Sequence, residues 1–238
     1  MLIALSGGVD SSYLLHAAKG CGADVRPYFV KTAFQPVTEL LDAKRAADAA
    51  GVSLGVLYED VLAEPEICAN GADRCYHCKR FMFEKLISAA KAEGIETVID
   101  GTNASDDADD RPGMRALAEL NVRSPLRECG LGKADTRRAA EELGLHNWRK
   151  PPYSCLATRI MPGVTITAEG LAKAENAEKF LSGLGFSDFR VRLYHGAARI
   201  QVTQAQTERL IAMRGEILAG LSEFDAVMLD LQPREESV

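Results

Sequence analysis

The sequence has little of what would place the protein on a nucleic acid or in a membrane. Basic residues do not predominate, since 28 Lys and Arg stand against 34 Asp and Glu and give a net charge of −6. General nucleic-acid and membrane-surface binders need the opposite sign, although a local basic pocket stays compatible with this balance. No stretch is long and apolar enough to span a bilayer. The chain begins without a basic region or a signal-type cleavage site, so we expect a cytoplasmic protein.

Cysteines are too few for a disulfide scaffold, because only six occur in 238 residues. In a reducing compartment, clustered thiols more often bind metal or take part in chemistry. Two of them form Cys75-Tyr76-His77-Cys78, and a third, Cys155, stands far downstream. Cys21, Cys68 and Cys129 have no comparable partners.

The first part of the chain alternates between short apolar runs and helical patterns. Strands are expected at residues 2–5, 25–31, 54–58 and 97–100, and helices at 11–19, 38–50, 81–93 and 135–143. Strands that alternate with helices of this length predict an α/β fold, with a parallel sheet that carries helices on both faces.

The pattern changes after Pro151-Pro152. Helices are expected at residues 167–184 and 206–218, paired strands at 189–194 and 198–203, and a last strand at 224–231. This is a small α+β unit. We therefore expect two domains, at residues 1–150 and 151–238.

The run Ser6-Gly7-Gly8-Val9-Asp10-Ser11-Ser12 joins the first strand to the first helix. Ligands bind at such junctions in open α/β sheets. The glycines let the backbone approach a pyrophosphate, and the helix N-terminus adds N–H groups and the positive end of a dipole. The three serines add hydroxyl donors, and Asp10 can hold Mg²⁺. The run lacks the lysine of the Walker loop. It instead resembles the PP-loop of the ATP pyrophosphatases, which cleave ATP between its α and β phosphates.

Three interpretations compete for Cys75 and Cys78. A dithiol redox pair would need a thioredoxin-like setting, which the surrounding pattern does not supply. A structural zinc ion would need further ligands, with His77 or His146 as candidates. A 4Fe-4S cluster on three cysteines would leave one iron open for an external ligand such as sulfide. The residues alone do not rank zinc far below the cluster.

Taken together, the motifs resemble the LarE family, which makes the nickel-pincer nucleotide cofactor of lactate racemase. The resemblance covers nearly the whole chain. It rests on the PP-loop, Arg74-Cys75-Tyr76-His77-Cys78-Lys79, Asp100-Gly101-Thr102-Asn103, Asp110-Arg111-Pro112-Gly113, Arg123-Ser124-Pro125-Leu126, Pro152-Tyr153-Ser154-Cys155-Leu156-Ala157-Thr158-Arg159, Ala177-Glu178-Lys179 and Phe189-Arg190-Val191-Arg192 through Ala198-Arg199-Ile200.

The resemblance implies a PP-loop ATP pyrophosphatase fold, of the adenine nucleotide alpha hydrolase type, and an adenylation reaction. ATP and Mg²⁺ would activate a carboxylate of pyridinium-3,5-biscarboxylic acid mononucleotide, with Gly101 joining the PP-loop in the nucleotide site. A sulfur nucleophile would then displace AMP and leave a thiocarboxylate. One type of family member sacrifices the sulfur of a single cysteine, and the other is similar to thiolation enzymes that hold a 4Fe-4S cluster. Cys75, Cys78 and Cys155 match the second type, with sulfide or another sulfur donor as partner.

Two departures from the family pattern are visible. The chain starts almost at its first strand, without the preceding helix that we would expect. Ser154-Cys155 also leaves a one-position ambiguity against the sacrificial type. A sacrificial Cys155 is therefore the alternative mechanism.

The strand expected at 189–194 places Arg190 and Arg192 on one face. Two arginines on one face could clamp a phosphate or a carboxylate, although a solvated face is an equal interpretation from the residues alone. The resemblance favours substrate binding, with Arg159, Glu178 and Arg199 as further candidates. It also makes the second domain a substrate-binding and oligomerisation domain of a homo-oligomer.

Other functions use parts of the same pattern. A tRNA thiolation enzyme would share the loop and the cysteines, but it would carry a broad basic surface or an added RNA-binding domain. An ammonia-using amide ligase of the NAD synthetase type would share the loop and would not need three cysteines. A nucleotide-binding module clipped by zinc on Cys75 and Cys78 would not be an enzyme at all.

Overall fold

The computed structural model describes residues 1–106 and 112–235. Asp110 and Arg111, which belong to one of the motifs quoted above, lie outside the described residues. The chain forms two compact units, one of residues 1–67 and 72–150 and the other of residues 68–71 and 151–238. Within the described part of the chain, no helix has the length and apolar character needed to cross a membrane.

The first unit is an α/β structure. Its strands are β1 (Leu2–Ala4), β2 (Arg26–Lys31), β3 (Gly55–Tyr58) and β4 (Val98–Ile99). Its helices are α1 (Val9–Gly20), α2 (Val37–Ala49), α3 (Pro65–Cys68, whose last residue belongs to the second unit), α4 (Arg74–Ala92), α5 (Pro112–Glu119), α6 (Pro125–Glu128) and α7 (Lys133–Glu142), with a short 3-10 turn, η1 (Val61–Ala63).

The four strands form one parallel sheet in the order β3-β2-β1-β4. Leu2 of β1 pairs with Arg26 on one side and with Val98 on the other. Successive side chains of a strand point to opposite faces. Leu2 and Ile3 are both fully buried, which requires helices on both faces of β1.

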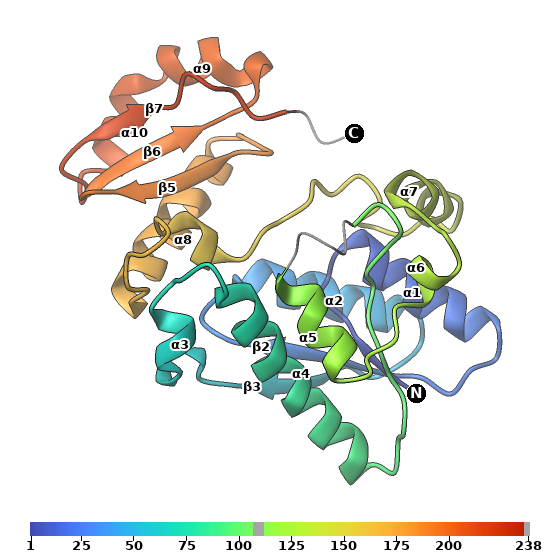
Figure 1. The fold of residues 1–238 in the computed structure, drawn as a ribbon. Helices are drawn as coiled ribbons and strands as arrows, with labels where there is room; N and C mark the ends of the chain where they lie inside the picture. The colour runs from blue at the N-terminus through green and yellow to red at the C-terminus, as the bar shows by residue number, and fades with distance from the viewer. Residues whose placement is uncertain (107–111, 236–238) are drawn as a thin grey trace. The chain divides into compact units, whose positions relative to one another are not determined.

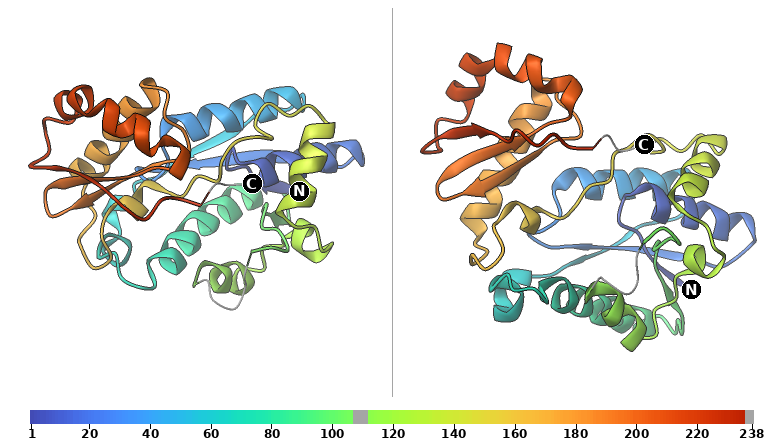
Figure 2. Two further views of the ribbon diagram at one scale, coloured as in Figure 1. Left: turned by 90° about the horizontal axis from the view of Figure 1, so that it is seen from above. Right: turned by 45° about the horizontal axis from the view of Figure 1, so that its top comes forward.

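Two apolar clusters show how the faces are covered. Ile3 packs with residues of α1 and α2 such as Leu15 and Ala43. Leu2 packs on the other face with residues of α4 and α5 such as Leu86 and Leu117. The right-hand view of Figure 2 shows the strands between α2 and α4. The predicted parallel α/β sheet with helices on both faces is confirmed.

Several boundaries differ from the prediction. The helix expected from residue 81 begins at Arg74, so the Cys-x-x-Cys pair lies in the first turn of α4 and not in a turn before it. Residues 74–80 carry no apolar stripe at helical spacing, which is why periodicity missed this turn. Helix α7 begins at Lys133, and Asp135 accepts a hydrogen bond from the Gly132 N–H at 3.1 Å from inside the helix.

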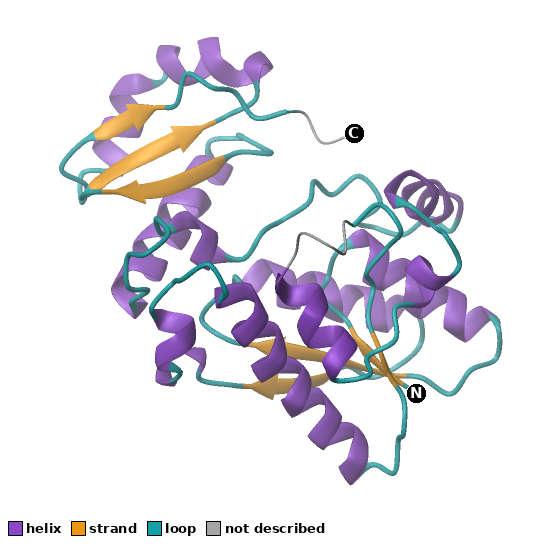
Figure 3. Ribbon diagram, viewed as in Figure 1, coloured by secondary structure: helices purple, strands orange, loops and turns teal. Residues whose placement is uncertain are grey.

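The second unit consists of three strands with helices. The strands are β5 (Arg190–Tyr194), β6 (Ala197–Gln201) and β7 (Val227–Leu229), and they lie side by side in that order (Figure 3). The helices are α8 (Ala168–Gly183), α9 (Thr207–Ala212) and α10 (Arg214–Gly220), with 3-10 turns η2 (Leu156–Arg159) and η3 (Gln204–Gln206).

The two strands that the sequence pairs are present as an antiparallel hairpin. Tyr194 pairs with Ala197, so His195 and Gly196 form a two-residue turn. Both have positive φ angles, 48° and 81°, as a turn matched to the strand twist requires. The single helix expected at 206–218 is wrong, because the chain breaks at Met213 into α9 and α10. Gly215 weakens a continuous helix at this place.

One apolar cluster fills one face of this second sheet. Val191, Ala198 and Ile200 pack there with residues of α8, α9 and α10. The alternation of a strand then turns Arg190, Arg192 and Arg199 to the opposite face. The expected division of side chains along this strand is confirmed.

Residues 68–71 are hydrogen-bonded into the second unit. The Asn70 side chain donates to the carbonyls of Met161 at 2.7 Å and Val164 at 3.1 Å. Its own carbonyl accepts from the Gly163 N–H, and the Cys68 carbonyl accepts from the Ile166 N–H. Asn70 is almost fully buried and has a φ of 55°, a conformation that Asn tolerates better than most residues.

Candidate functional site

A cavity of about 310 Å³ lies in the first unit at the carboxyl ends of β1 and β4. The chain runs from β1 outward through β2 to β3 and then crosses back to β4, so β1 and β4 flank the point where the strand order reverses. Ligands of open α/β sheets bind at this point. The described lining comes from the loops after the two strands, from β2 and from α4: Ala4, Leu5, Ser6, Gly8, Asp10, Ser11, Tyr28, Phe29, Val30, Gln35, Lys79, Met82, Phe83, Leu86, Asp100, Gly101, Thr102 and Asp106.

The structure divides the predicted nucleotide loop into two groups of residues. Ser6, Gly8, Asp10, Ser11 and Gly101 line the cavity. The described lining leaves out Gly7, Val9 and Ser12, whose contacts hold the loop from behind.

The contacts behind the loop are close. Gly7 has a φ of 79°, and a Cβ at this position would lie 2.4 Å from the Glu39 carbonyl oxygen of α2. Ser12 is 1% exposed, and its hydroxyl donates to the Gly8 carbonyl at 2.8 Å. Val9 packs with Ala140 and Leu145. The chain therefore needs glycine at position 7 for packing, whatever binds in front of it.

Gly101 brings the two crossover loops together. A Cβ on Gly101 would lie 2.7 Å from the Ser11 nitrogen and 2.8 Å from its Cα. The loop after β4 therefore touches the N-terminal turn of α1 at a distance that only glycine allows. This contact places Asp100 and Thr102 beside the loop after β1.

Asp10 is held by its neighbours and is short of positive charge. Its carboxylate accepts hydrogen bonds from the Asn103 amide at 3.2 Å and from the Thr136 hydroxyl. Burial raises the pKa of Asp10, the two hydrogen bonds lower it, and nearby Asp106 raises it further. A cation at this carboxylate would offset the cost of burying its charge.

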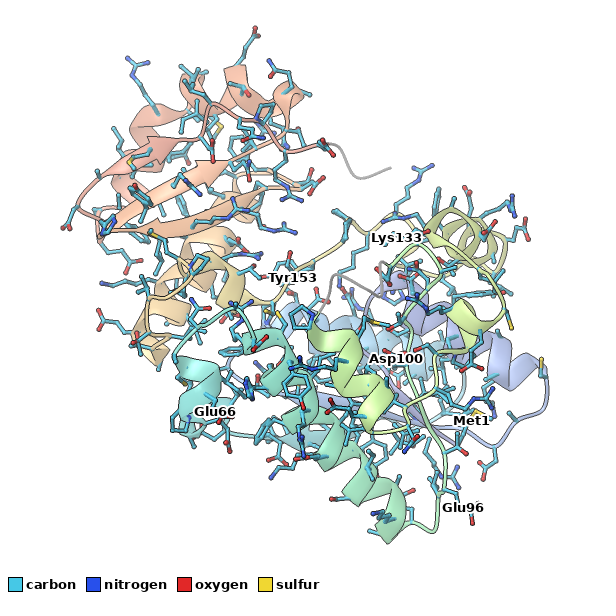
Figure 4. All side chains as sticks on the ribbon, in the orientation of Figure 1. Met1, Glu66, Glu96, Asp100, Lys133 and Tyr153 are labelled. Carbon is cyan, nitrogen blue, oxygen red and sulfur yellow. The ribbon has the colours of Figure 1, made fainter. Side chains whose placement is uncertain are left out.

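Lys79 and Asp100 were not assigned a role from the sequence. Asp100 (labelled in Figure 4) is 5% exposed and accepts from the hydroxyls of Thr102 at 2.5 Å and Ser124 at 2.7 Å. The Lys79 ammonium lies 4.0 Å from the same carboxylate. Lys79 shares the helical spacing of Met82, Phe83 and Leu86, and this pattern could have shown that it faces the same cavity.

The three cysteines of interest come from both units. Cys75 is exposed, Cys78 is buried to 9% exposure, and the two stand three residues apart on α4. The Arg74 guanidinium lies 3.5 Å from the Cys75 sulfur. Cys155 belongs to the second unit, directly before η2. In the described residues, no group of three His, Cys, Asp or Glu side chains is arranged to hold a metal ion, and the cluster stays a prediction.

The histidines considered as zinc ligands have acidic partners. The His77 Nδ1 lies 2.9 Å from a Glu66 carboxylate oxygen. The His146 Nε2 lies 3.6 Å from Asp42. The zinc interpretation also stays a prediction.

Arg159 and Glu178 form a buried ion pair within the second unit. Arg159 is 1% exposed, and its Nε and Nη2 donate to the two carboxylate oxygens of Glu178 at 2.6 and 3.1 Å. The Tyr153 hydroxyl and the Val191 N–H also donate to Glu178. Such a pair is stable only when its remaining hydrogen-bonding groups are satisfied.

The same guanidinium supports the segment that carries Cys155. Its Nη1 donates to the carbonyls of Ser154 at 3.0 Å and Cys155 at 3.4 Å. The partners of Arg159 and Glu178 are thus protein groups. Their assignment as substrate ligands stays a prediction, and the geometry gives them a role in holding residues 153–155.

Arg190, Arg192 and Arg199 differ in their surroundings. Arg190 is 5% exposed and donates to the carbonyls of Phe189 at 2.7 Å and Pro152 at 2.8 Å. Burial lowers its pKa to about 10. Arg192 and Arg199 stand directly opposite each other on β5 and β6, an arrangement that is unfavourable for like charges. Burial and then Arg199 lower the pKa of Arg192.

The fold and the cavity define an α/β protein whose parallel sheet carries a glycine- and serine-rich loop at its ligand-binding edge. No protein-family model matches the sequence. The chain is 33% identical to the pyridinium-3,5-bisthiocarboxylic acid mononucleotide synthase of Lactiplantibacillus plantarum, over 96% of this chain and 84% of the relative.

Two further relatives are uncharacterized proteins. One from Synechocystis sp. is 36% identical over 97% of this chain and 88% of its own length. One from Methanocaldococcus jannaschii is 32% identical over 94% of this chain and 85% of its own length. The chain belongs to the LarE family.

Neutralising Asp10 should stabilise the fold. Because burial raises its pKa, the ionised carboxylate disfavours folding above that pKa, and the penalty disappears as the pH falls through it. Asp10→Asn should therefore raise the free energy of unfolding at neutral pH, by an amount that shrinks as the pH is lowered. Urea unfolding at several pH values measures this. The exposed Asp48→Asn is the control, and a gain that does not change with pH would contradict the explanation.

Proposed function

We propose that the chain is an ATP-dependent sulfurtransferase that acts on pyridinium-3,5-biscarboxylic acid mononucleotide. Each carboxylate attacks the α phosphorus of ATP, pyrophosphate leaves, and a sulfur nucleophile then replaces AMP at the acyl carbon. One ATP is used for each carboxylate. The observation that carries the proposal is the switch-point cavity lined by the serine- and glycine-rich loop, in a member of a family with a relative named for the bisthiocarboxylic product.

The lining of the cavity supports ATP as the co-substrate. One part is polar, with Ser6, Gly8 and Ser11 at the N-terminus of a 12-residue helix, where phosphate oxygens find N–H and hydroxyl donors. Another part is apolar, with Phe29, Val30 and Met82 among its members. A purine base fits apolar and aromatic surroundings of this kind.

Asp10 and Lys79 would balance the charges of the bound nucleotide. A carboxylate whose pKa is raised by burial gains from a nearby Mg²⁺, and Mg²⁺ uses one or two carboxylates together with phosphate oxygens. When bound, the ion withdraws charge from the phosphates. Lys79 is the lysine among the described lining residues, and we assign it to the phosphate that carries the developing charge.

The arginines of β5 and β6 support an anionic substrate group. Arg192 and Arg199 face each other across the two strands, and the Arg199 Nε has no hydrogen-bond partner in the described structure, although Asp230 lies 3.6 Å away. Two opposed guanidinium groups gain from a phosphate or carboxylate placed between them. This makes Arg192 and Arg199 the stronger substrate ligands, and it gives Arg190 a supporting role.

Cys75, Cys78 and Cys155 would supply the sulfur chemistry. Thiolates are the ligands that iron–sulfur clusters use, and two of these cysteines share one turn of α4. When bound to the three cysteines, a 4Fe-4S cluster supplies an open iron that can take sulfide. In the alternative mechanism, Cys155 gives up its own sulfur and can react only once per chain.

Substrate-dependent release of pyrophosphate tests the activity. With ATP, Mg²⁺ and the biscarboxylic mononucleotide, the chain should release pyrophosphate and AMP, and a sulfur source should shift the product mass to the thiocarboxylate. Asp10→Ala should lower the rate by about a hundredfold or more, because the metal contributes several kcal/mol of charge stabilisation. Release of ADP and phosphate, or a rate that does not depend on the mononucleotide, would contradict the proposal.

Arg192 and Arg190 should respond differently to replacement by alanine. Arg192→Ala should raise the KM for the mononucleotide about tenfold to a hundredfold, since a lost charged hydrogen bond costs about 1.5–3 kcal/mol. Arg190→Ala should lower the free energy of unfolding by about 2–3 kcal/mol, because it removes two buried backbone contacts. Steady-state kinetics and urea unfolding of both variants separate the roles. The reverse pattern would exchange them.

Iron and acid-labile sulfide tell the cysteine mechanisms apart. Anaerobically reconstituted protein should hold about four of each per chain, as a 4Fe-4S cluster requires. Cys75→Ser, Cys78→Ser and Cys155→Ser should each lose them, whereas Cys129→Ser, at an exposed position, should retain them. Zinc without labile sulfide would favour the clipped binding module. Loss of one sulfur mass at Cys155 after a single turnover would establish the sacrificial mechanism instead.

A further inference from the structure

Lys150 is the last residue of the first unit, and its side chain reaches the back of the nucleotide loop. The Lys150 ammonium lies 3.3 Å from the Gly7 carbonyl oxygen, 2.7 Å from a Glu39 carboxylate oxygen and 2.8 Å from Asp42. Both carboxylates belong to α2, the helix against which Gly7 packs. The lysine thus ties the loop, through one backbone oxygen, to that helix.

A second donor from the same segment reaches the same oxygen. The Asn147 side-chain amide donates to the Gly7 carbonyl at 3.1 Å and to the Ser12 hydroxyl at 2.9 Å. Asn147 is 3% exposed. The Lys150 N–H donates to the Asn147 carbonyl, so residues 147–150 form a turn. The Arg137 guanidinium holds this turn by its contacts with the carbonyls of Trp148 and Lys150.

Fixing the Gly7 carbonyl also fixes the N–H of Gly8. In a trans peptide the C=O and the following N–H point in opposite directions. No cis peptide bond occurs in the described chain. Gly8 lines the cavity, whereas the donors on the Gly7 carbonyl come from residues 147–150 behind the loop. The cation on the carbonyl also polarises the peptide and makes the N–H a stronger donor.

We propose that Lys150 is a positioning residue of the nucleotide loop, which holds the Gly7–Gly8 peptide so that the Gly8 N–H faces a bound phosphate. The inference rests on the proposed function. It also accounts for the missing Walker lysine in a new way. The described lining of the cavity does not include Lys150, and its charge is balanced by Glu39 and Asp42. The lysine acts on the phosphate through the peptide rather than by touching it.

ATP binding to the whole chain tests the proposal. Lys150→Met should raise the Kd for ATP–Mg²⁺, measured by titration calorimetry, about tenfold, with a matching rise in the KM for ATP and little change in the KM for the mononucleotide. Lys150→Arg should recover most of the affinity. Lys44→Met, at an exposed position of α2, is the matched control. Unchanged ATP affinity in folded Lys150→Met would overturn the proposal.

A double-mutant cycle tests whether the effect passes through the peptide. Gly8 has a φ of −80°, which proline can adopt, so Gly8→Pro removes the N–H, and Gly8→Ala measures the effect of added bulk alone. In the Gly8→Pro background, Lys150→Met should no longer weaken ATP binding. Additive effects of the two substitutions would overturn the proposal. If Lys150→Met does not fold, Lys150→Gln serves in its place.

The wild-type titration separates the two levels of the argument. A wild-type chain that does not bind ATP–Mg²⁺ would refute the proposed function, and with it the inference. A wild-type chain that binds ATP–Mg²⁺ while the Lys150 variants bind it equally well would refute the inference alone.

Discussion

The close approach of Gly7 to helix α2 is the contact on which the first unit depends. A side chain at position 7 would meet the Glu39 carbonyl oxygen at 2.4 Å, so the loop can pass from β1 into α1 only where a Cβ is missing. This passage aims the N-terminus of α1 at the edge of the sheet. Gly101 then meets Ser11 in the same manner. The cavity therefore exists because two backbones touch where side chains are absent.

The second unit depends on a different interaction, the buried pair of Arg159 and Glu178. Glu178 accepts from Tyr153 and from the N–H of Val191 on the edge strand β5. Arg159 donates to the carbonyls on either side of the Ser154–Cys155 junction. One ion pair thus links the helix α8, the sheet and the segment of Cys155. Removing either partner would leave a buried charge, which costs about 3–5 kcal/mol.

Periodicity in the sequence was sufficient to predict the parallel sheet, the placement of the loop after β1 and the hairpin of β5 and β6. It failed where the deciding contacts are distant in sequence or where apolar spacing is missing. The first turn of α4 has no apolar stripe, and the short helices α3, α5 and α6 begin at prolines that were not used as start signals.

The side-chain networks of the site lay further beyond the sequence. Nothing in the local pattern shows that Asn147 and Lys150 donate to Gly7, or that Arg159 faces Glu178 rather than solvent. The motif residues were found because their types are unusual for a core. Their partners were missed because Lys, Asn and Glu are ordinary surface residues until the fold brings them together.

The second unit borrows residues 68–71 from the middle of the first stretch of chain, and this has a consequence for synthesis. Asn70 leaves the ribosome long before Met161 and Val164, the residues that satisfy its amide. During that interval a polar side chain destined for burial must remain in water. The contact also spans a large sequence separation, which slows its formation. A cut at residue 150 would therefore not yield two complete folding units, because one of them would lack an internal strand of its own wall.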